Sequence, residues 1–247
     1  MKHRLMHGLV ALSVIALAAC SDTAGPDGTD SQLESLLTLD VAMVSADALI
    51  EDLAELQWAF GGGVGGAFAA PLDRVRTVTF YDADGNEQEA YDEVTTASVH
   101  ILSEISGEMA RESWSGTISR TRDITVTGLE GDETSRTANG TGSSAVFRSS
   151  HSDENGDRSY DMSGTSVITD VVQSVPGEEN SYPLSGTITR DMTVVIVNGP
   201  DGDETRTRHV VITFNGTQFA TMTVDGESFE VDLSTRSGRH PFRRRQG

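Results

Sequence analysis

The pattern of hydrophobic and polar positions divides the chain into one helical segment and a long region of strands. From Ser31 to Phe60, apolar residues recur at steps of three and four, and Ser31 and Glu34 have the spacing of a capping box. This pattern predicts one N-terminal amphipathic helix over residues 31–60, with its acidic residues mostly outside the apolar stripe. We expect the apolar stripe to pack on the protein's own sheet.

Residues 73–235 predict strands throughout, because Thr, Val and Ile alternate and each run ends in a turn rich in Asp, Asn and Gly. Turns of the Asn-Gly and Asp-Gly type supply the positive φ angles that tight hairpins need, so successive strands are expected to pair antiparallel. The predicted turns are Asp82–Asn86, Gly128–Asp132, Asn139-Gly140, Asp153–Asp157, Pro176–Asn180, Gly199–Asp203, Asn215-Gly216 and Asp225-Gly226.

Two stretches of this region are near copies of each other. Residues 115–134 read SGTISRTRDITVTGLEGDET, and residues 185–205 read SGTITRDMTVVIVNGPDGDET. The copies predict a duplicated up-and-down meander, in which each unit has four strands. The fold class is therefore all-β, with about ten strands in a curved or barrel-like sheet. The units are repeats over 77–141, which includes a strand with Tyr91, and over 145–217, with a partial third from 219.

The side-chain period of a strand places the same kinds of residue on matching faces of the two copies. One face is half apolar and contains arginines, and the opposite face begins with threonine and serine. This indicates a sheet that is wetted on one face and curled around a core or a groove. The positions expected to point inward are Ile118, Arg120, Arg122, Ile124 and Val126 in the first copy, and Ile188, Arg190, Met192, Val194 and Ile196 in the second.

The N-terminus has the features of an export signal. Lys2 and Arg4 precede an apolar run that is too short to span a bilayer as a mature helix, and the run ends in Leu17-Ala18-Ala19-Cys20. This segment resembles the lipobox of bacterial lipoproteins. The resemblance implies a signal peptide over 1–19, lipidation of Cys20 and a membrane anchor. Ser21 resembles the outer-membrane sorting pattern, so we expect a lipid-anchored protein of the cell envelope, at the outer rather than the inner membrane. The alternative is an ordinary secretory signal with an incidental cysteine.

Three further segments are predicted from composition. Residues 20–30 indicate a flexible tether, residues 61–72 a glycine-rich hinge, and residues 236–247 a basic tail that is frayed and solvated. Removal of residues 1–19 leaves 16 basic against 38 acidic residues, a formal charge of −22. An acidic body of this kind argues against nucleic-acid binding and against lying flat on anionic lipid.

The candidate chemistry is sparse. The turn residues Asp82, Asp84, Asn86, Asp153, Asn155 and Asp157 are weak calcium candidates, because the glycine of a calcium loop is missing at its sixth position, where Glu87 and Arg158 stand. Hairpin turns alone account for these residue types. No histidine has the spacing of a metal site, and no nucleophile motif or phosphate loop is present, so we expect no metal, no cofactor and no catalytic residues.

The arginines on the apolar face are the remaining candidates, because a buried guanidinium must be paired. Arg120, Arg122 and Arg190, with Trp114, are expected either to bind an anionic ligand or to form salt bridges with nearby carboxylates. The expected function is a non-catalytic envelope protein that binds a small or acyl ligand, or an envelope protein partner, through a curved sheet. The architecture resembles lipocalin-like and lipoprotein-carrier half-barrels in outline. The alternatives are a scaffold lipoprotein without a ligand and an enzyme of unrecognised class.

Overall fold

The computed structural model describes residues 27–59, 72–111, 114–131, 133–150, 157–175, 182–199, 202–234 and 242–244. These residues form helix α1 (Asp27–Ala59) and a series of strands. The strands are β1 (Leu72–Tyr81), β2 (Glu87–Gln88), β3 (Ser98–Arg111), β4 (Trp114–Thr127), β5 (Ser135–Ser150), β6 (Arg158–Ser174), β7 (Ser185–Gly199), β8 (Gly202–Thr213), β9 (Phe219–Val224), β10 (Glu227–Asp232) and β11 (Phe242–Arg244).

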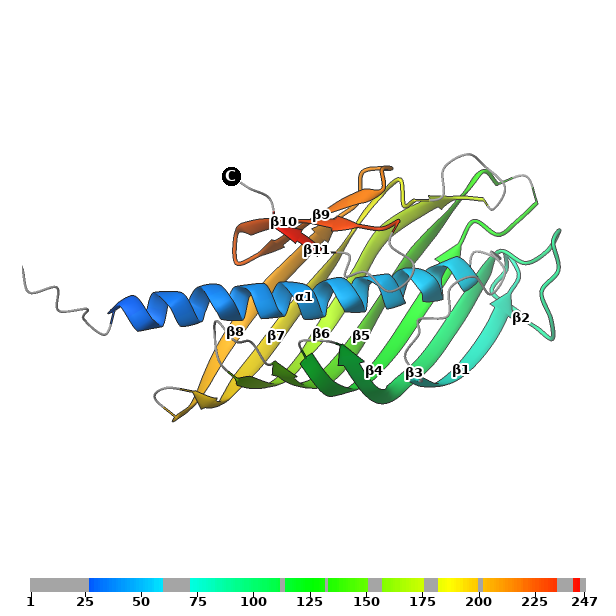
Figure 1. Cartoon of the computed structure of the whole chain (residues 1–247). Helices are drawn as coiled ribbons and strands as arrows, with labels where there is room; N and C mark the ends of the chain where they lie inside the picture. Colours follow the sequence, from blue (N-terminus) through cyan, green and yellow to red (C-terminus); the bar gives the residue numbers. More distant parts are fainter. Residues whose placement is uncertain are drawn as a thin grey trace, which may run out of the picture. The chain divides into compact units, whose positions relative to one another are not determined.

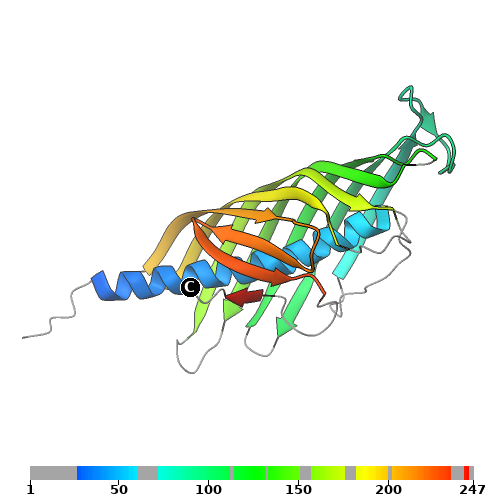
Figure 2. The same cartoon turned by 90° about the horizontal axis from the view of Figure 1, so that it is seen from above.

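The strands form one antiparallel sheet with the order β11-β10-β9-β8-β7-β6-β5-β4-β3-β1-β2. From β3 to β11 every strand pairs with the next one along the chain, and the short β2 folds back on the far side of β1. The sheet is strongly curved, and in the described residues its ends stay apart as open edges (Figures 1 and 2). The predicted all-β, up-and-down architecture is therefore confirmed as a curved sheet, without closure into a barrel.

The alternation of buried and exposed side chains confirms the predicted faces of the strands. In β4 the side chains of Ile118, Arg120 and Arg122 are buried, and the intervening Thr117, Ser119 and Thr121 are exposed. In β7 the matching Ile188 and Arg190 are also buried. Each buried large aliphatic side chain contributes roughly 1.5–3 kcal/mol of transfer free energy. The inward face thus forms the core, and the outward face is wetted.

Helix α1 supplies the other half of that core. From Leu37 onward the helix belongs to the same compact unit as the sheet, and this part lies along the concave face (Figures 1 and 2). Leu37, Val41, Leu49 and Leu56 have no exposed surface. The first ten residues of α1 belong to a separate unit. The helix begins at Asp27, four residues before the predicted start, so the predicted tether over 20–30 is too long.

Several turns lie where the sequence predicts them. At Asp225-Gly226 both residues have positive φ, 48° and 92°, and the turn joins β9 to β10. Gly85 has a φ of 82° and lies in the turn after β1, and Asn215-Gly216 connects β8 to β9. Asn and Asp tolerate this left-handed region better than most side chains, and glycine adopts it without strain.

Two predicted elements are wrong. Asn139-Gly140 lies inside β5, where the register shifts at a bulge, and the Asn139 Oδ1 accepts a hydrogen bond from the backbone N–H of Asp170 in β6. The Asn-Gly pair therefore makes a bulge, where the sequence predicted a turn. Tyr91 lies in the connection between β2 and β3 and packs against Phe80 at a ring distance of 5.9 Å, so the predicted strand around it is absent from the described residues.

Part of the predicted basic tail is a strand, because Phe242–Arg244 pair with Phe229–Val231 of β10. The predicted signal peptide, Cys20, most of the tether, residues 61–71 of the hinge, Asp153, Asn155 and the turn at Pro176–Asn180 lie outside the described residues. In the described part of the chain, no helix has the length and apolarity required to cross a membrane.

Candidate functional site

Five acidic residues of α1 are buried where the helix faces the concave sheet. Asp40, Asp47, Glu51, Asp52 and Glu55 are each at most 5% exposed. The sequence pattern placed these acids mostly outside the apolar stripe, and the structure shows that they are nevertheless buried, because the facing sheet carries arginines. A carboxylate on this helix therefore finds a counter-charge inside the protein.

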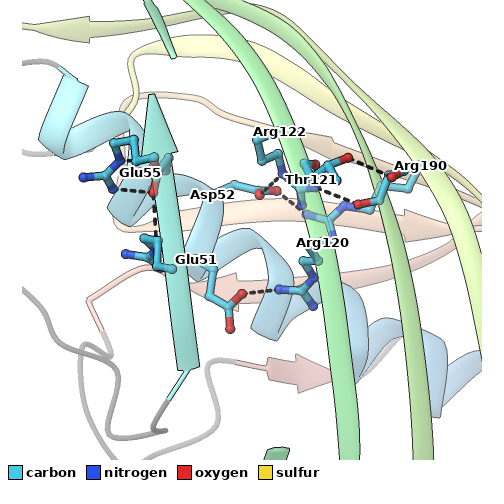
Figure 3. Close-up of polar contacts among 10 residues, drawn as sticks. Glu51, Asp52, Glu55, Arg120, Thr121, Arg122 and Arg190 are labelled. Atoms are coloured by element: carbon cyan, nitrogen blue, oxygen red, sulfur yellow. Dashed lines mark hydrogen bonds and ion pairs between the residues drawn. The ribbon is translucent and has the colours of Figure 1, made fainter. Parts of the chain in front are cut away.

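The carboxylate of Glu55 is bound by two arginines of β1 (Figure 3). Arg76 donates from Nε to Oε1 and from Nη2 to Oε2, each over 2.6 Å, which is the bidentate geometry that guanidinium and carboxylate favour. Arg74 lies within 3.7 Å of Oε2. Glu55 thus ties the C-terminal part of the helix to the β1 edge.

Asp52 lies between arginines from two strands that are far apart in sequence (Figure 3). Arg122 of β4 donates from Nε to Oδ1 over 2.6 Å, and Arg190 of β7 donates from Nη2 to Oδ2 over 2.6 Å. Burial raises the pKa of Asp52, but the charges of Arg122 and Arg190 outweigh burial and hold the pKa below its ordinary value. Asp52 therefore stays ionised and bridges the two copies of the repeat.

Among the described residues, Glu51 has one ion-pair partner, the guanidinium Nη1 of Arg120 in β4 (Figure 3). Burial raises the pKa of Glu51, and the opposing effect of Arg120 is too small to reverse this, since Asp52 and Asp47 add repulsion. The other carboxylate oxygen, Oε1, is buried and has no hydrogen-bond partner in the part of the chain that the structure describes. We call the set Glu51, Asp52, Glu55, Arg76, Arg120, Arg122 and Arg190 the ion-pair belt.

Small residues on β5 make room for the belt. Arg122 lies across the inner face, where its Nη1 donates to the backbone oxygens of Thr121, over 2.7 Å, and Ser143, over 3.3 Å. A Cβ atom on Gly142 would lie 2.6 Å from that Nη1, so any larger residue would displace the guanidinium. Gly142 therefore permits Arg122 to reach both the backbone and Asp52.

A second group, the Asp40 cluster, consists of Asp40, Arg148, Arg158, Trp114 and Tyr160. Asp40 lies 3.0 Å from Nη2 of Arg158 and 3.6 Å from Nη2 of Arg148. Arg148 stacks over the Trp114 ring at 4.6 Å from its centroid, and Arg158 donates from Nε to the Tyr160 hydroxyl over 3.1 Å. Burial lowers the pKa of Arg148, and Asp40 partly restores it.

The predicted ligand residues are thus found in two places. Arg120, Arg122 and Arg190 come together in the ion-pair belt, and their partners are helix carboxylates, the salt-bridge alternative of the sequence analysis. Trp114 lies in the Asp40 cluster beside Arg148. Sequence reasoning missed Arg148, Arg158 and the helix acids. Arg148 is two residues from both Val146 and Ser150 on β5, and this strand period is a signal that would have placed Arg148 on the same, inward face.

The predicted calcium residues of the first turn bind each other. Asp82 Oδ1 accepts backbone hydrogen bonds from Asp84, over 3.0 Å, and Asn86, over 2.8 Å, while its Oδ2 accepts one from the Asn86 side chain, over 2.9 Å. These bonds lower the pKa of Asp82. They form an ordinary Asx turn. Within the described residues, no group of three or more His, Cys, Asp or Glu side chains is placed to hold a metal ion.

The outward face of the sheet is acidic, whereas the inward positions carry the arginines. Every arginine of β1 and β4–β8 occupies an inward position in the register, and the described outward positions of β1 and β3–β8 contain no arginine or lysine. The outward histidines, His100 and His209, each contact an aspartate, Asp123 and Asp191 respectively, over 2.7 Å. The outward acidic residues of these strands include Asp73, Glu104, Glu108, Asp123, Asp161, Asp191 and Asp203.

The arrangement therefore holds a helix in the curve of a sheet and leaves an acidic, hydroxyl-rich surface outside. Neither the ion-pair belt nor the Asp40 cluster combines a nucleophile with a general base. No protein-family model, curated protein or solved structure matches the chain.

Proposed function

We propose that the protein is a lipid-anchored, non-catalytic protein of the cell envelope that binds a cationic envelope partner through the convex face of its sheet. The observation that carries the proposal is the segregation of charge between the two faces. The strand arginines point toward the concave side, where α1 from Leu37 on occupies the curve. The convex face is left with carboxylates and hydroxyl groups, and a positive surface complements it.

The anchor part of the proposal is supported by Leu17-Ala18-Ala19-Cys20, the lipobox-like end of the signal segment. An anchor at Cys20 would keep the acidic body near the membrane without attraction to anionic lipid, because like charges repel. The convex face would then be available to proteins or other cationic components of the same envelope.

The test compares two variants that remove the same number of acidic charges. The first is Glu104→Gln with Asp123→Asn and Asp191→Asn, all on the convex face. The control is Glu89→Gln with Glu93→Gln and Glu130→Gln, all exposed in connections between strands. The probe is an arginine decapeptide, with a citrulline decapeptide as its neutral counterpart, and binding is measured by titration calorimetry at low salt.

We expect the convex-face variant to bind the arginine peptide about fivefold more weakly than the parent, because each exposed ion pair contributes about 0.2–1 kcal/mol. The control variant should change binding less than twofold. Equal losses in the two variants would show that only net charge matters, and the convex face would then have no role as a binding surface.

A second candidate function is binding of a small anionic or acyl ligand between helix and sheet. One observation favours it: Arg120 Nε, Arg148 Nη1 and Arg190 Nε are buried and have no hydrogen-bond partner among the residues that the structure describes. An anionic group would satisfy these donors. Solvent extraction of the purified protein followed by mass spectrometry would support this function by releasing one anionic compound per chain, and an empty extract would contradict it.

A further inference from the structure

The convex face contains a hollow of about 450 Å³ over β3 to β6. Its lining includes the small residues Gly107, Ser119 and Ala145 and the aromatic residue Phe147. Phe147 is a large aromatic residue on a face that is otherwise wetted and polar, and it is 44% exposed. The hollow exists because a large side chain stands next to small ones in the neighbouring row of the sheet.

Two carboxylates flank the exposed ring. The register places Glu108, Thr117, Phe147 and Asp161 in one row across β3, β4, β5 and β6. Asp161 is directly opposite Phe147, and side chains in such pairs have Cβ atoms about 4.5–5.5 Å apart. Glu108 lies on the other side of the ring, beyond Thr117. Both carboxylates are exposed and line the hollow.

This combination matches the side chain of an arginine. A guanidinium stacks on an aromatic ring, its aliphatic stem packs on small apolar residues, and carboxylates at the rim pair with its charge. An acyl chain fits less well, because the anionic head of its lipid would meet Glu108 and Asp161 without a counter-charge. A cation–π contact at an exposed ring strengthens binding only about two- to fivefold, so the hollow provides specificity more than affinity.

We propose that the Phe147 hollow docks a single arginine side chain of the cationic partner. The proposal rests on the proposed function, since it names the position on the convex face where the partner is recognised. The hollow then orients a partner that the general negative charge of the face attracts.

The experiment uses the same arginine and citrulline decapeptides with the full-length protein. Phe147→Ala should weaken binding of the arginine peptide about three- to fivefold and leave binding of the citrulline peptide unchanged. The matched control is Val167→Ala, because Val167 is equally exposed, at 45%, on the same face but does not line the hollow. Val167→Ala should change binding less than twofold.

The charged rim gives a second comparison. Asp161→Asn should weaken binding about two- to fivefold, and Glu104→Gln, which removes an acid outside the hollow, less than twofold. Nuclear magnetic resonance titration should shift the amide signals of Gly107, Ser119 and Ala145 before those of the β7 and β8 residues.

The outcomes separate the two proposals. If Phe147→Ala and Val167→Ala bind alike while the triple convex-face variant is weakened, the hollow is not the docking position and the proposed function stands. If neither the triple variant nor Phe147→Ala loses affinity relative to its control, both proposals fail. If Phe147→Ala weakened binding of the arginine and citrulline peptides equally, the proposed docking of an arginine in the hollow would also fail. Such a result would show that the hollow has no preference for a charged side chain.

Discussion

Asp52 illustrates how a single residue joins distant parts of the chain. Its two carboxylate oxygens bind Arg122 of the first repeat copy and Arg190 of the second. Arg190 matches Arg120 in the repeat, and Arg122 is the next inward position after Arg120. Within the described residues, neighbouring Glu51 has one ion-pair partner, and its second carboxylate oxygen has none. The two acids are therefore expected to respond in opposite ways to protonation, since the folded state lowers the pKa of Asp52 and raises that of Glu51.

At this scale we predict that Asp52→Asn lowers the free energy of unfolding by about 3–5 kcal/mol at neutral pH, because two buried guanidinium groups lose their partner. Glu51→Gln should cost clearly less, since burial already disfavours the ionised form of Glu51. Urea denaturation of both variants and the parent measures the difference. Equal losses in the two variants would contradict the inference that arginine partners offset the burial of Asp52 more fully than that of Glu51.

The pH dependence follows from the signs of the shifts. A lowered pKa means that the stabilisation from Asp52 is present above the ordinary value of 3.8 and is lost as the pH falls through the folded-state pKa. The deficit of Asp52→Asn should therefore shrink below about pH 3.8. A raised pKa means that Glu51 favours folding below the ordinary value of 4.5, and that this contribution is lost as the pH rises through its folded-state pKa.

At the scale of elements, strands β4 and β7 are equivalent in what they bury. Ile118 is 3% exposed and Ile188 has no exposed surface, while Thr117 is exposed on the other face and Thr187 is partly exposed. The inward row continues with arginine in both strands, so each strand contributes apolar packing at one position and an ion pair at the next. Helix and sheet are thus joined by alternating hydrophobic and charged contacts.

We predict that Ile118→Ala and Ile188→Ala each lower the free energy of unfolding by about 2–5 kcal/mol, because a buried side chain is removed and a cavity remains. Thr117→Ala and Thr187→Ala should change it by less than about 0.5 kcal/mol, since surface substitutions are usually this small. Denaturant melts of the four variants provide the measurement. A loss at Ile118 without one at Ile188 would show that the two strands are not equivalent.

These elements show how far prediction from sequence reaches. The alternation in β4 and β7 is local, so the inward arginines are predictable from the strand period alone. The Asn139-Gly140 bulge is not, because the same residue types that close a hairpin also fit a bulge, and the choice depends on the register with β6. The burial of the helix acids is not predictable either, since it depends on which surface the helix meets.

At the scale of the whole molecule, the curved sheet separates the charges. Its concave side holds the arginines against α1, and its convex side holds acids, serines and threonines. The chain has a formal net charge of −20, yet its inner face is locally positive where the helix acids meet it. An acidic surface gains nothing from anionic lipid, so the attachment to a membrane that we propose rests on Cys20.

We predict that Cys20→Ala abolishes acylation and leaves the protein soluble or unprocessed, because the thiol that carries the lipid is gone. Several acyl chains are needed for firm attachment, since one chain alone binds a membrane only weakly. Fractionation of cells that express the parent and the variant checks the prediction. A variant that still sediments with the membranes like the parent would show that the lipobox-like segment does not provide the anchor.

The sequence by itself determined the elements and their faces: a helix near the N-terminus, a meander of antiparallel strands, and arginines at inward positions of a duplicated pattern. These properties depend on residues close together in the chain, through the periods of helix and strand. Only the tertiary structure decided that residues 40–55 meet Arg120, Arg122, Arg148 and Arg190, and that Phe147 faces a hollow between Glu108 and Asp161. Such contacts join residues on separate elements, and the curvature of the whole sheet sets which of them come within reach.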